Sequence, residues 1–382
     1  MNIIEETLNN QDVMVCVLTG GPVAGKSSLE IPIMELALCL NYDMIWIDET
    51  ATQLINSGLK PVNGMTSPLE FQRILFEYQR FKEDQYIHME RETNRKLIIV
   101  CDRGLLDAKA YMNDKEWSQL LSMVGTSDVE ILSRYLFVIH MVTAAEGAEE
   151  AFEANRAGNK ARSKDETKDV AIALDHKIRE AYLGHRNVFY VSNETDFEGK
   201  KEKALKIFLS CIGKKELSEH QEKYIVEIPG ITYFFEKKAQ KRHIVQTYLK
   251  PYGNEERRLR MLGDGKNFVY YLSRKEIGSN TGIQEKRIGR DMYDTLMMEM
   301  DPSKKPIIKD RWYFSDHNVY YNLDVYPNWK KHAILEIRSS QEDVITQLPQ
   351  DIKMVKNVTE DTRFQNYRLS EYFPLEEEIV TL

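Results

Sequence analysis

Short apolar runs alternate with longer amphipathic stretches over roughly the first 210 residues of the chain. This alternation is typical of parallel strands that are connected by helices. The apolar runs predict strands at Val13–Leu18, Met44–Ile47, Leu97–Cys101, Leu136–Met141 and Val188–Val191. The amphipathic stretches predict helices that include Ser27–Leu40, Ser67–Arg95 and Asp165–Leu183. We therefore expect a doubly wound α/β domain in this part of the chain.

The pattern changes near Lys214. From Lys223 onward, short runs rich in Val, Ile, Tyr and Phe carry charged residues at alternate positions, and turns such as Gly263-Asp264-Gly265 separate them. This pattern predicts an antiparallel sheet, with the polar stretch Gly213–His220 as the linker. We expect domains over 1–214 and 215–357, followed by a loosely attached acidic tail over 358–382.

Charge and composition narrow the possible functions. The 382 residues contain 52 Lys and Arg against 60 Asp and Glu, a net charge of −8, so the whole chain does not attract nucleic acid and any anion site must be local. No apolar run reaches the ~18 residues of a membrane span, and the first residues lack the features of a signal peptide. We expect a cytoplasmic protein without a transmembrane segment. Its four cysteines are too scattered for a Cys-x-x-Cys metal or redox site.

A glycine-rich motif follows the first predicted strand and precedes a predicted helix. The stretch from Gly20 to Ser27 matches the Gly-x-x-x-x-Gly-Lys-Ser/Thr pattern, whose glycines let phosphate oxygens approach backbone N–H groups. Lys26 would neutralise the β- and γ-phosphates, and Ser27 would hold Mg²⁺. The alternative is a purely structural glycine turn. The predicted nucleotide-binding residues are Gly20, Gly21, Pro22, Val23, Ala24, Gly25, Lys26, Ser27 and Ser28.

Charged residues also follow two of the other predicted strands. Asp102 and Arg103 stand at the carboxyl end of one strand, where open α/β sheets bind ligands, so Asp102 is a candidate Mg²⁺ ligand and Arg103 a candidate phosphate contact. A helix cap with a surface partner is the alternative for this pair. Asp48 and Glu49 follow another strand; either could accept a proton from a hydroxyl nucleophile or cap the next helix.

The segment Asn155–Glu166 places several cations among small residues. A mobile lid that closes over a transferring phosphate has this composition, and so does a solvated charged loop. In the lid hypothesis, Arg162 is a catalytic phosphate clamp. The cations of the segment are Arg156, Lys160, Arg162 and Lys164.

These segments together resemble the NadR/Ttd-type P-loop family. The resemblance rests on GGPVAGKSS, Asp48-Glu49-Thr50-Ala51, Phe71-Gln72-Arg73, CDRGLLDAKAYM, HMVTAAEGAEEAF and LGHRNVFYVSNETDFEGK, and it covers nearly all of 13–210. The segment from His140 to Phe152 is closer to the branch associated with TRP-channel translocation than to the bacterial kinase branch. The resemblance implies a guanine-nucleotide-binding protein that also recognises phosphatidic acid or phosphoinositides, acts in membrane traffic and associates peripherally with membranes.

Residues 219–340 resemble the CYTH, or triphosphate-tunnel, fold. The matching segments are Gln246–Leu249, Arg257–Arg260, Tyr271–Lys275, Lys309–Arg311, Leu323–Val325 and Leu335–Arg338. Because strand side chains alternate between faces, cations two residues apart share a face, which predicts a basic lumen in a β-barrel. The alternative is an ordinary sheet whose cations face solvent. The predicted anion-binding residues are Lys223, Arg258, Arg260, Lys275, Lys309 and Arg311.

Two positions depart from the tunnel-enzyme pattern. The usual Glu-x-Glu-x-Lys stretch reads Glu219-His220-Gln221-Glu222-Lys223, and the usual Glu-x-Glu near the last strand reads Glu336-Ile337-Arg338. The loss of two carboxylates weakens the case for metal-assisted triphosphate hydrolysis but leaves anion binding intact.

Three functional hypotheses follow. The first is a regulatory protein that binds GTP or ATP with Mg²⁺ and recognises phosphorylated ligands, such as lipid headgroups or polyphosphate, in its basic tunnel. The second is a small-molecule, nucleoside-type kinase with Asp48 or Glu49 as base and with Arg103 and Arg162 as phosphate clamps. The third is a triphosphate hydrolase in the tunnel domain.

Overall fold

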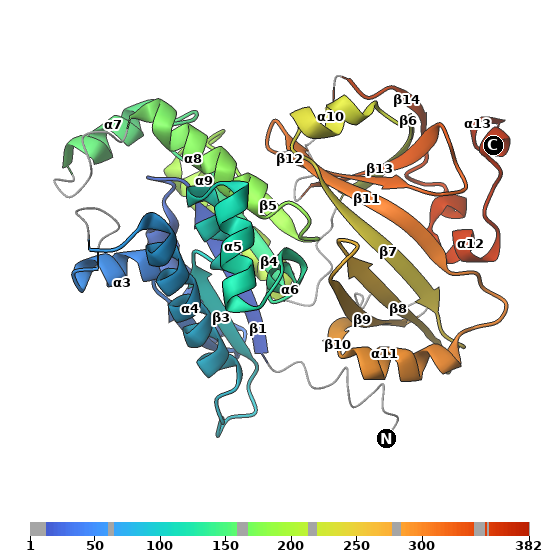
Figure 1. Ribbon diagram of the computed structural model, residues 1–382, viewed down its shortest axis with the longest axis horizontal. Helices are drawn as coiled ribbons and strands as arrows, with labels where there is room; N and C mark the ends of the chain where they lie inside the picture. The colour runs from blue at the N-terminus through green and yellow to red at the C-terminus, as the bar shows by residue number, and fades with distance from the viewer. Residues whose placement is uncertain are drawn as a thin grey trace. The chain divides into compact units, whose positions relative to one another are not determined.

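The computed structural model describes residues 13–59, 65–158, 167–212, 220–276, 284–339, 348–349 and 351–381. The chain divides into two compact units, one formed by residues 11–213 and one that contains residues 214–382 (Figure 1). No helix within the described residues is long and apolar enough to cross a membrane.

A parallel sheet forms the centre of the first unit. Within the described residues it has five strands, β1 (Val13–Gly20), β2 (Asp43–Ile47), β3 (Leu97–Asp102), β4 (Phe137–Met141) and β5 (Val188–Val191). Their order is β2-β3-β1-β4-β5, and all are parallel. Strands β3, β4 and β5 are buried along their whole length, as expected for a parallel sheet that is covered on both faces. The predicted parallel α/β sheet is confirmed.

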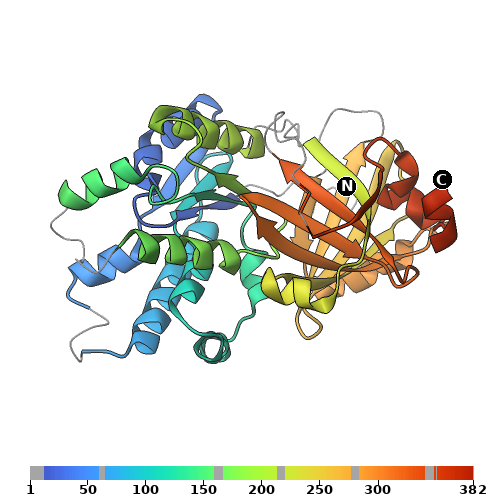
Figure 2. The ribbon, with the colours of Figure 1, turned by 90° about the horizontal axis from the view of Figure 1, so that it is seen from above.

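Helices cover both faces of this sheet. They are α2 (Glu30–Cys39), α3 (Thr50–Asn56), α4 (Pro68–Ile87), α5 (Asp114–Val124), α6 (Asp128–Leu132), α7 (Glu149–Gly158), α8 (Lys168–Ala181) and α9 (Phe197–Ile212), with 3₁₀ turns η1 (Lys26–Leu29) and η2 (Leu105–Tyr111). Helices α2 and α9 pack together on one face, whereas α4, α5 and α8 lie on the other (Figure 2). Since the strands are parallel, the loops after β1 to β5 meet at one edge of the sheet.

An antiparallel sheet dominates the second unit. Its described strands are β6 (His220–Glu227), β7 (Gln240–Tyr248), β8 (Glu255–Gly263), β9 (Phe268–Glu276), β10 (Gln284–Ile288), β11 (Ile307–Asp316), β12 (Val319–Val325), β13 (His332–Ser339) and β14 (Met354–Asn357). They follow the order β10-β9-β8-β7-β11-β12-β13-β6-β14. The predicted antiparallel sheet is confirmed. Among the described residues, strand hydrogen bonds do not join β10 to β14.

One face of this sheet is apolar and covered by helices. Helix α10 (Ile231–Glu236) packs there against β6 and β11 to β13, and α11 (Arg290–Leu296) packs against β8 to β10. Figure 1 shows α10 in yellow and α11 in orange. Phe314, Leu323 and Leu335 on this face are fully buried. The covered face therefore holds one core of the unit, and the opposite face carries most of the charged strand residues together with a second apolar cluster around Ile225 and Ile334.

The C-terminal segment is firmly packed, which corrects the expectation of a loosely attached tail. It contains η4 (Thr362–Phe364), α12 (Asn366–Glu371) and α13 (Glu376–Thr381). Phe364, Leu369 and Ile379 are buried against Ile225 and Ile334 of the sheet. These apolar residues are spaced among acidic ones, so the acidic composition of the segment hid the face that packs onto the sheet.

Candidate functional site

The glycine-rich loop after β1 has the backbone conformation that its sequence predicts. Gly20 and Gly25 have φ values of 144° and 89°, which side chains rarely tolerate. A Cβ at Gly20 would lie 2.0 Å from the carbonyl oxygen of Met141. Val23 also has a positive φ, 57°. The loop is therefore a tightly turned connection between β1 and η1.

Lys26 projects into the cavity that this loop borders. Its Nζ lies 3.4 Å from the carbonyl oxygen of Gly20, which it can contact only weakly. Burial and the nearby Arg103 guanidinium lower the pKa of Lys26 to about 8, although Asp102 and Glu49 oppose this effect. A bound anion would relieve both the burial cost and the repulsion, so this lysine suits a phosphate ligand.

Asp102 ends β3 beside the loop and has an unsatisfied oxygen. Its side chain is 8% exposed, and its Oδ1 has no hydrogen-bond partner among the described residues. Burial raises the pKa of Asp102 to about 6, against the opposing effect of Lys26. Ser27 is exposed at the same cavity. An unpartnered carboxylate oxygen and a serine hydroxyl that line the same cavity are both oxygen ligands of the kind that Mg²⁺ prefers.

Glu49, Arg103 and Asp107 form a charged cluster at the same edge. Arg103 Nε lies 2.5 Å from Glu49 Oε1, and Arg103 Nη1 lies 3.0 Å from Asp107 Oδ1. Arg103 has a φ of 70°, an uncommon value that these contacts help to hold. Burial opposes ionisation of Glu49, but Arg103 and a hydrogen bond from Thr52 lower its pKa below the ordinary value. Glu49 is therefore a carboxylate at neutral pH.

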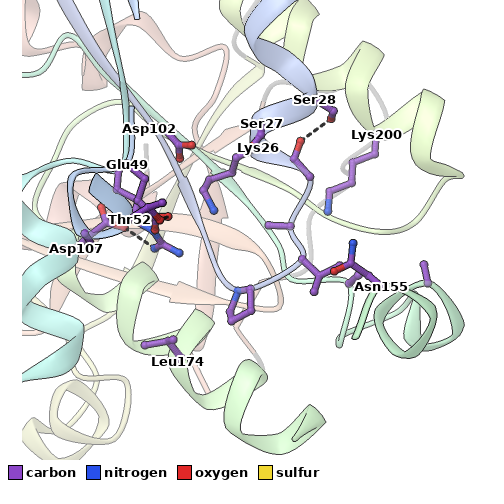
Figure 3. A pocket seen from close by; sticks show the side chains of 18 of the residues that line it. Lys26, Ser27, Ser28, Glu49, Thr52, Asp102, Asp107, Asn155, Leu174 and Lys200 are labelled. Carbon is purple, nitrogen blue, oxygen red and sulfur yellow. Dashed lines mark hydrogen bonds and ion pairs between the residues drawn. The ribbon is translucent and has the colours of Figure 1, made fainter. Parts of the chain in front are cut away.

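The cavity around the loop is large. Its volume is about 1560 Å³, compared with the roughly 300–1,000 Å³ of typical small-ligand pockets. Because β1 is central in the strand order, residues after β2 and β3 lie on one side of the loop, and residues after β4 and β5 lie on the other. Figure 3 shows Glu49 and Asp107 on one side of Lys26, with Asn155 and Lys200 on the other. The cavity has room for a nucleotide and a second small molecule.

One face of α4 lines the β2–β3 side of the cavity, a role that the sequence analysis did not assign. Phe71, Gln72, Leu75 and Gln79 all contribute to it. The side chain of Gln79 already has hydrogen-bond partners within the protein, because it accepts a hydrogen bond from Thr50 and donates one to Glu83. Gln72 is 8% exposed, and its Oε1 has no partner among the described residues. The spacing i, i+1, i+4, i+8 could have identified this helix face.

The β5–α9 turn lines the other side and was also missed. Lys200 is buried, and its Nζ donates to the Val142 carbonyl oxygen at 2.6 Å and to Asn193 Oδ1 at 2.7 Å. The Phe197 ring lies so close to Gly25 that a Cβ there would be 2.6 Å from the ring. Lysine and asparagine after a short apolar strand were the available signals in the sequence.

The predicted catalytic residues do not all line the cavity. Glu49, Asp102 and Arg103 line the cavity, but Asp48 is exposed and lies outside its lining. Arg162 and most of the predicted lid, with Lys160 and Lys164, lie outside the described residues. Of the nine residues predicted for the loop, Gly20 ends β1 and the other eight follow it. The cavity lining includes Pro22, Val23, Ala24, Gly25, Lys26, Ser27 and Ser28.

The predicted cations of the second unit share one face of its sheet. Strand pairing aligns Arg242 with Arg311, Gln246 with Arg260, and Glu336 with Lys223. Directly paired residues point to the same side, so the parity can be followed from strand to strand. The six predicted cations, Lys223, Arg258, Arg260, Lys275, Lys309 and Arg311, all fall on the face opposite α10 and α11. We call this the cationic face.

Three of these cations are neutralised by buried acids. Asp324 Oδ2 lies 2.6 Å from Lys309 Nζ, and Asp324 Oδ1 lies 2.5 Å from Arg311 Nε. Glu336 contacts Arg311 at 2.8 Å and Lys223 at 3.4 Å. Burial lowers the pKa of Lys309 to about 8, and Asp324 opposes this effect. This part of the cationic face is largely compensated.

The neighbouring part has spare positive charge. Arg260 contacts Glu285, but within the described part of the chain no carboxylate lies within ion-pair distance of Arg258 or Lys275. Arg242 is 4% exposed, and its Nε has no described partner. Both polar atoms of the fully buried Asn322 also lack described partners. Arg258 and Lys275 are therefore the predicted anion-binding cations without a described ion pair.

The buried acids among the described residues of this unit contact cations. Within the described residues, no group of three or more His, Cys, Asp or Glu side chains is arranged to hold a metal ion. Asp324, Glu336 and Glu285 each contact a cation instead. Glu219 and the side chains of Gln221 and Arg338 lie outside the described part, so the predicted departures at these positions remain predictions.

Comparisons with known proteins agree with a P-loop assignment. Residues 15–200 match the family described as an AAA domain. No curated protein sequence matches the chain. The first unit contains an AAA-like P-loop domain.

Several solved structures are similar to parts of the chain. The inorganic triphosphatase NE1496 is 20% identical, with a TM-score of 0.32, and the match covers 41% of this chain and 97% of that one. Deoxyadenosine kinase from M. mycoides, with products bound, is 14% identical, with a TM-score of 0.35; the match covers 50% of this chain and 97% of that one. The PH1012 protein from Pyrococcus horikoshii OT3 is 14% identical, with a TM-score of 0.23, over 32% of this chain and 80% of that one.

Proposed function

We propose that the first unit binds a nucleoside triphosphate, GTP or ATP, together with Mg²⁺. The main support for this proposal is that Lys26 and the unpartnered oxygen of Asp102 face one cavity at the glycine-rich loop. The lysine needs an anion and the carboxylate needs a cation, and a magnesium nucleotide supplies both. Ser27 and Asp102 would hold the ion, directly or through its water. The ion would screen the charge of the phosphates.

The raised pKa of Asp102 makes this binding pH-dependent. Mg²⁺ requires the ionised carboxylate, and Asp102 takes up a proton as the pH falls through about 6. We expect Mg²⁺-dependent nucleotide affinity to fall roughly tenfold for each pH unit well below 6, because proton and metal compete for one site. Titration calorimetry between pH 5 and 8 measures this slope. Asp102→Asn should remove the slope together with the Mg²⁺ requirement; an unchanged slope in that variant would exclude Asp102 as its source.

Phosphoryl transfer to a hydroxyl acceptor is a second candidate activity. It is favoured by Glu49, an ionised carboxylate next to Arg103, and by the α4 side of the cavity, which extends beyond the space that a nucleotide needs. In this hypothesis Glu49 accepts the hydroxyl proton while Arg103 contacts the transferring phosphoryl group. Without an acceptor, the same site would only bind the nucleotide and hydrolyse it slowly, as a regulatory protein does.

For the second unit, we propose that the cationic face binds a phosphorylated ligand without a metal. Among the described residues, no acid lies within ion-pair distance of Arg258 or Lys275, although Glu256 is the cross-strand neighbour of Lys275 and the charge of Arg242 acts on Asp264. The acids at Asp324 and Glu336 are already engaged. On the basis of the family resemblance, we propose phosphatidic acid or phosphoinositide headgroups as the ligands of this face. We propose membrane traffic as the cellular process in which the protein acts. Metal-dependent triphosphate hydrolysis is not supported by this arrangement of acids.

The parity of β9 allows a matched test of this proposal. Lys275 lies on the cationic face, and its neighbour Arg274 lies on the other face, where it contacts Glu255. We expect Lys275→Ala and Arg258→Ala each to weaken tripolyphosphate binding roughly tenfold, since a charge-assisted contact is worth about 1.5–3 kcal/mol. Arg274→Ala should change it little, although it removes the same charge.

Titration calorimetry at two salt concentrations measures these affinities, and the wild-type affinity should fall with salt. Sedimentation with phosphatidic acid vesicles separates lipid headgroups from soluble polyphosphate as the ligand. If Arg274→Ala weakens binding as much as Lys275→Ala does, the anion does not bind to the cationic face.

A further inference from the structure

Asp175 lies fully buried next to the glycine-rich loop but does not line the cavity. It comes from the middle of α8, and its Oδ1 accepts hydrogen bonds from two backbone N–H groups. These are the N–H of Gly21, at 2.8 Å, and the N–H of Thr143, at 3.0 Å. One carboxylate oxygen thus joins the segment after β1 to the segment after β4.

The two segments are also joined directly at this point. Thr143 Oγ1 donates to the Pro22 carbonyl oxygen at 2.5 Å, and Asn193 Nδ2 donates to the Thr143 carbonyl oxygen at 2.8 Å. Pro22 and Asn193 both line the cavity. The position of Gly21 and Thr143 therefore affects both the loop and the β5–α9 turn.

The second oxygen of Asp175 is held by side chains. Oδ2 lies 3.1 Å from His140 Nε2 and 3.0 Å from Arg179 Nε, and Arg179 also contacts Glu146 at 2.9 Å. Burial opposes ionisation of Asp175, but His140, Arg179 and the Gly21 N–H lower its pKa. Asp175 is therefore a fixed anion with four donors, although it lies next to a loop suited to binding anions.

We propose that Asp175 is a positioning residue for the nucleotide site: it fixes the first turn of the glycine-rich loop against the segment after β4. This inference rests on the proposed nucleotide binding. If Asp175 positions the loop, removing its side chain should weaken nucleotide binding. If its role were purely electrostatic, removing a buried negative charge near the phosphates should strengthen nucleotide binding. The direction of the change therefore separates the two roles.

Two substitutions at the same position test the proposal. Asp175→Asn keeps an oxygen for Gly21 and Thr143. It removes the charge, and its NH2 group cannot accept from Arg179 Nε, but Arg179 keeps its contact with Glu146. We therefore expect nucleotide affinity within about threefold of wild type. Asp175→Ala removes the oxygen as well, and we expect affinity to fall about tenfold or more. Asp128→Ala is the control, since Asp128 contacts Lys109 and Trp117 outside the cavity.

Two readouts apply to the full chain: calorimetric titration with GTP and ATP in Mg²⁺, and hydrogen exchange of the peptide 13–29 without nucleotide. Asp175→Ala should speed exchange in this peptide, whereas Asp175→Asn and Asp128→Ala should not. If Asp175→Ala does not fold, Gly21→Ala disturbs the same contact, because its Cβ would lie 2.8 Å from Asp175 Oδ1. It should then give the faster exchange and the weaker binding.

The variant to be judged is Asp175→Ala or, if that variant does not fold, Gly21→Ala. The proposal is overturned if this variant binds nucleotide at least as tightly as wild type. It is also overturned if the peptide 13–29 of this variant exchanges at the wild-type rate. If the wild-type chain binds neither nucleotide, the proposed function fails. The exchange measurement still decides whether Asp175 fixes the loop in that case.

Discussion

Lys26→Ala is expected to weaken nucleotide binding by about 100-fold or more while the chain stays folded. The side chain lines the cavity, and within the described part of the chain its hydrogen bond to the protein is a long one, to the Gly20 carbonyl oxygen. A lysine that binds phosphates contributes charge-assisted hydrogen bonds, and 100-fold corresponds to about 2.8 kcal/mol. Burial lowers the pKa of Lys26 to about 8, which shows that its charge is unfavourably placed in the folded protein, so we expect the variant to stay folded.

Calorimetric titration and thermal melting test this together. Lys177→Ala is a matched control, because Lys177 is exposed on α8 and lies outside the cavity lining. The control should bind as wild type does, and all three proteins should melt at similar temperatures without ligand. Wild-type affinity in a folded Lys26→Ala variant would mean that the nucleotide binds elsewhere.

Glu49→Gln is expected to lower phosphoryl transfer by about 10²–10⁴-fold if the first unit is a kinase, with nucleotide affinity nearly unchanged. Glu49 is ionised and lines the cavity next to Arg103, so it can accept the hydroxyl proton of an acceptor. The amide of glutamine keeps the shape of the side chain but cannot act as this base. The measurement is acceptor-dependent product formation from ATP or GTP across a panel of small hydroxyl compounds.

The neighbouring carboxylate provides the control for this prediction. Asp48→Asn removes the same charge one residue earlier, but Asp48 is exposed and does not line the cavity. Transfer should continue in that variant. If no acceptor stimulates turnover in the wild type, the kinase hypothesis fails and the regulatory hypothesis stands. If Asp48→Asn and Glu49→Gln reduce phosphoryl transfer equally, Glu49 is not the base.

The sequence predicts the fold well because its signals are local. Apolar runs such as Val188–Val191 coincide with buried strands, and β2 and β4 begin within one residue of the predicted positions. Helix ends were less predictable, since α4 ends at Ile87 and the amphipathic pattern continues to Arg95. The packing of Phe364 and Leu369 was missed because it depends on distant strands and not on local composition.

Residues of the site can be predicted from the sequence only where they belong to a recognisable motif. The loop from Gly20 to Ser27 is such a case, because spacing and flanking elements specify it. By contrast, Gln72 and Lys200 reach the cavity from α4 and α9, where the sequence signals are weak: a helical spacing, and a lysine after a short apolar strand. Asp48 and Glu49 were equivalent in sequence; only the turn after β2 separates the exposed carboxylate from the one in the cavity.

Charge compensation also requires the three-dimensional structure. Strand parity correctly places the six cations on one face, but it does not reveal which of them meet acids. Asp324 and Glu336 neutralise Lys309, Arg311 and Lys223, whereas Arg258 and Lys275 have no described ion pair. The pairing depends on the register of β11 to β13 and on β6, which the sequence does not specify.

Calorimetric titration of the full chain with GTP and with ATP, in Mg²⁺ and in EDTA, tests the central claim most directly. The account predicts one bound nucleotide per chain for at least one of the two, with affinity that falls when Mg²⁺ is removed. Absence of binding by both nucleotides at millimolar concentration in Mg²⁺ would contradict it.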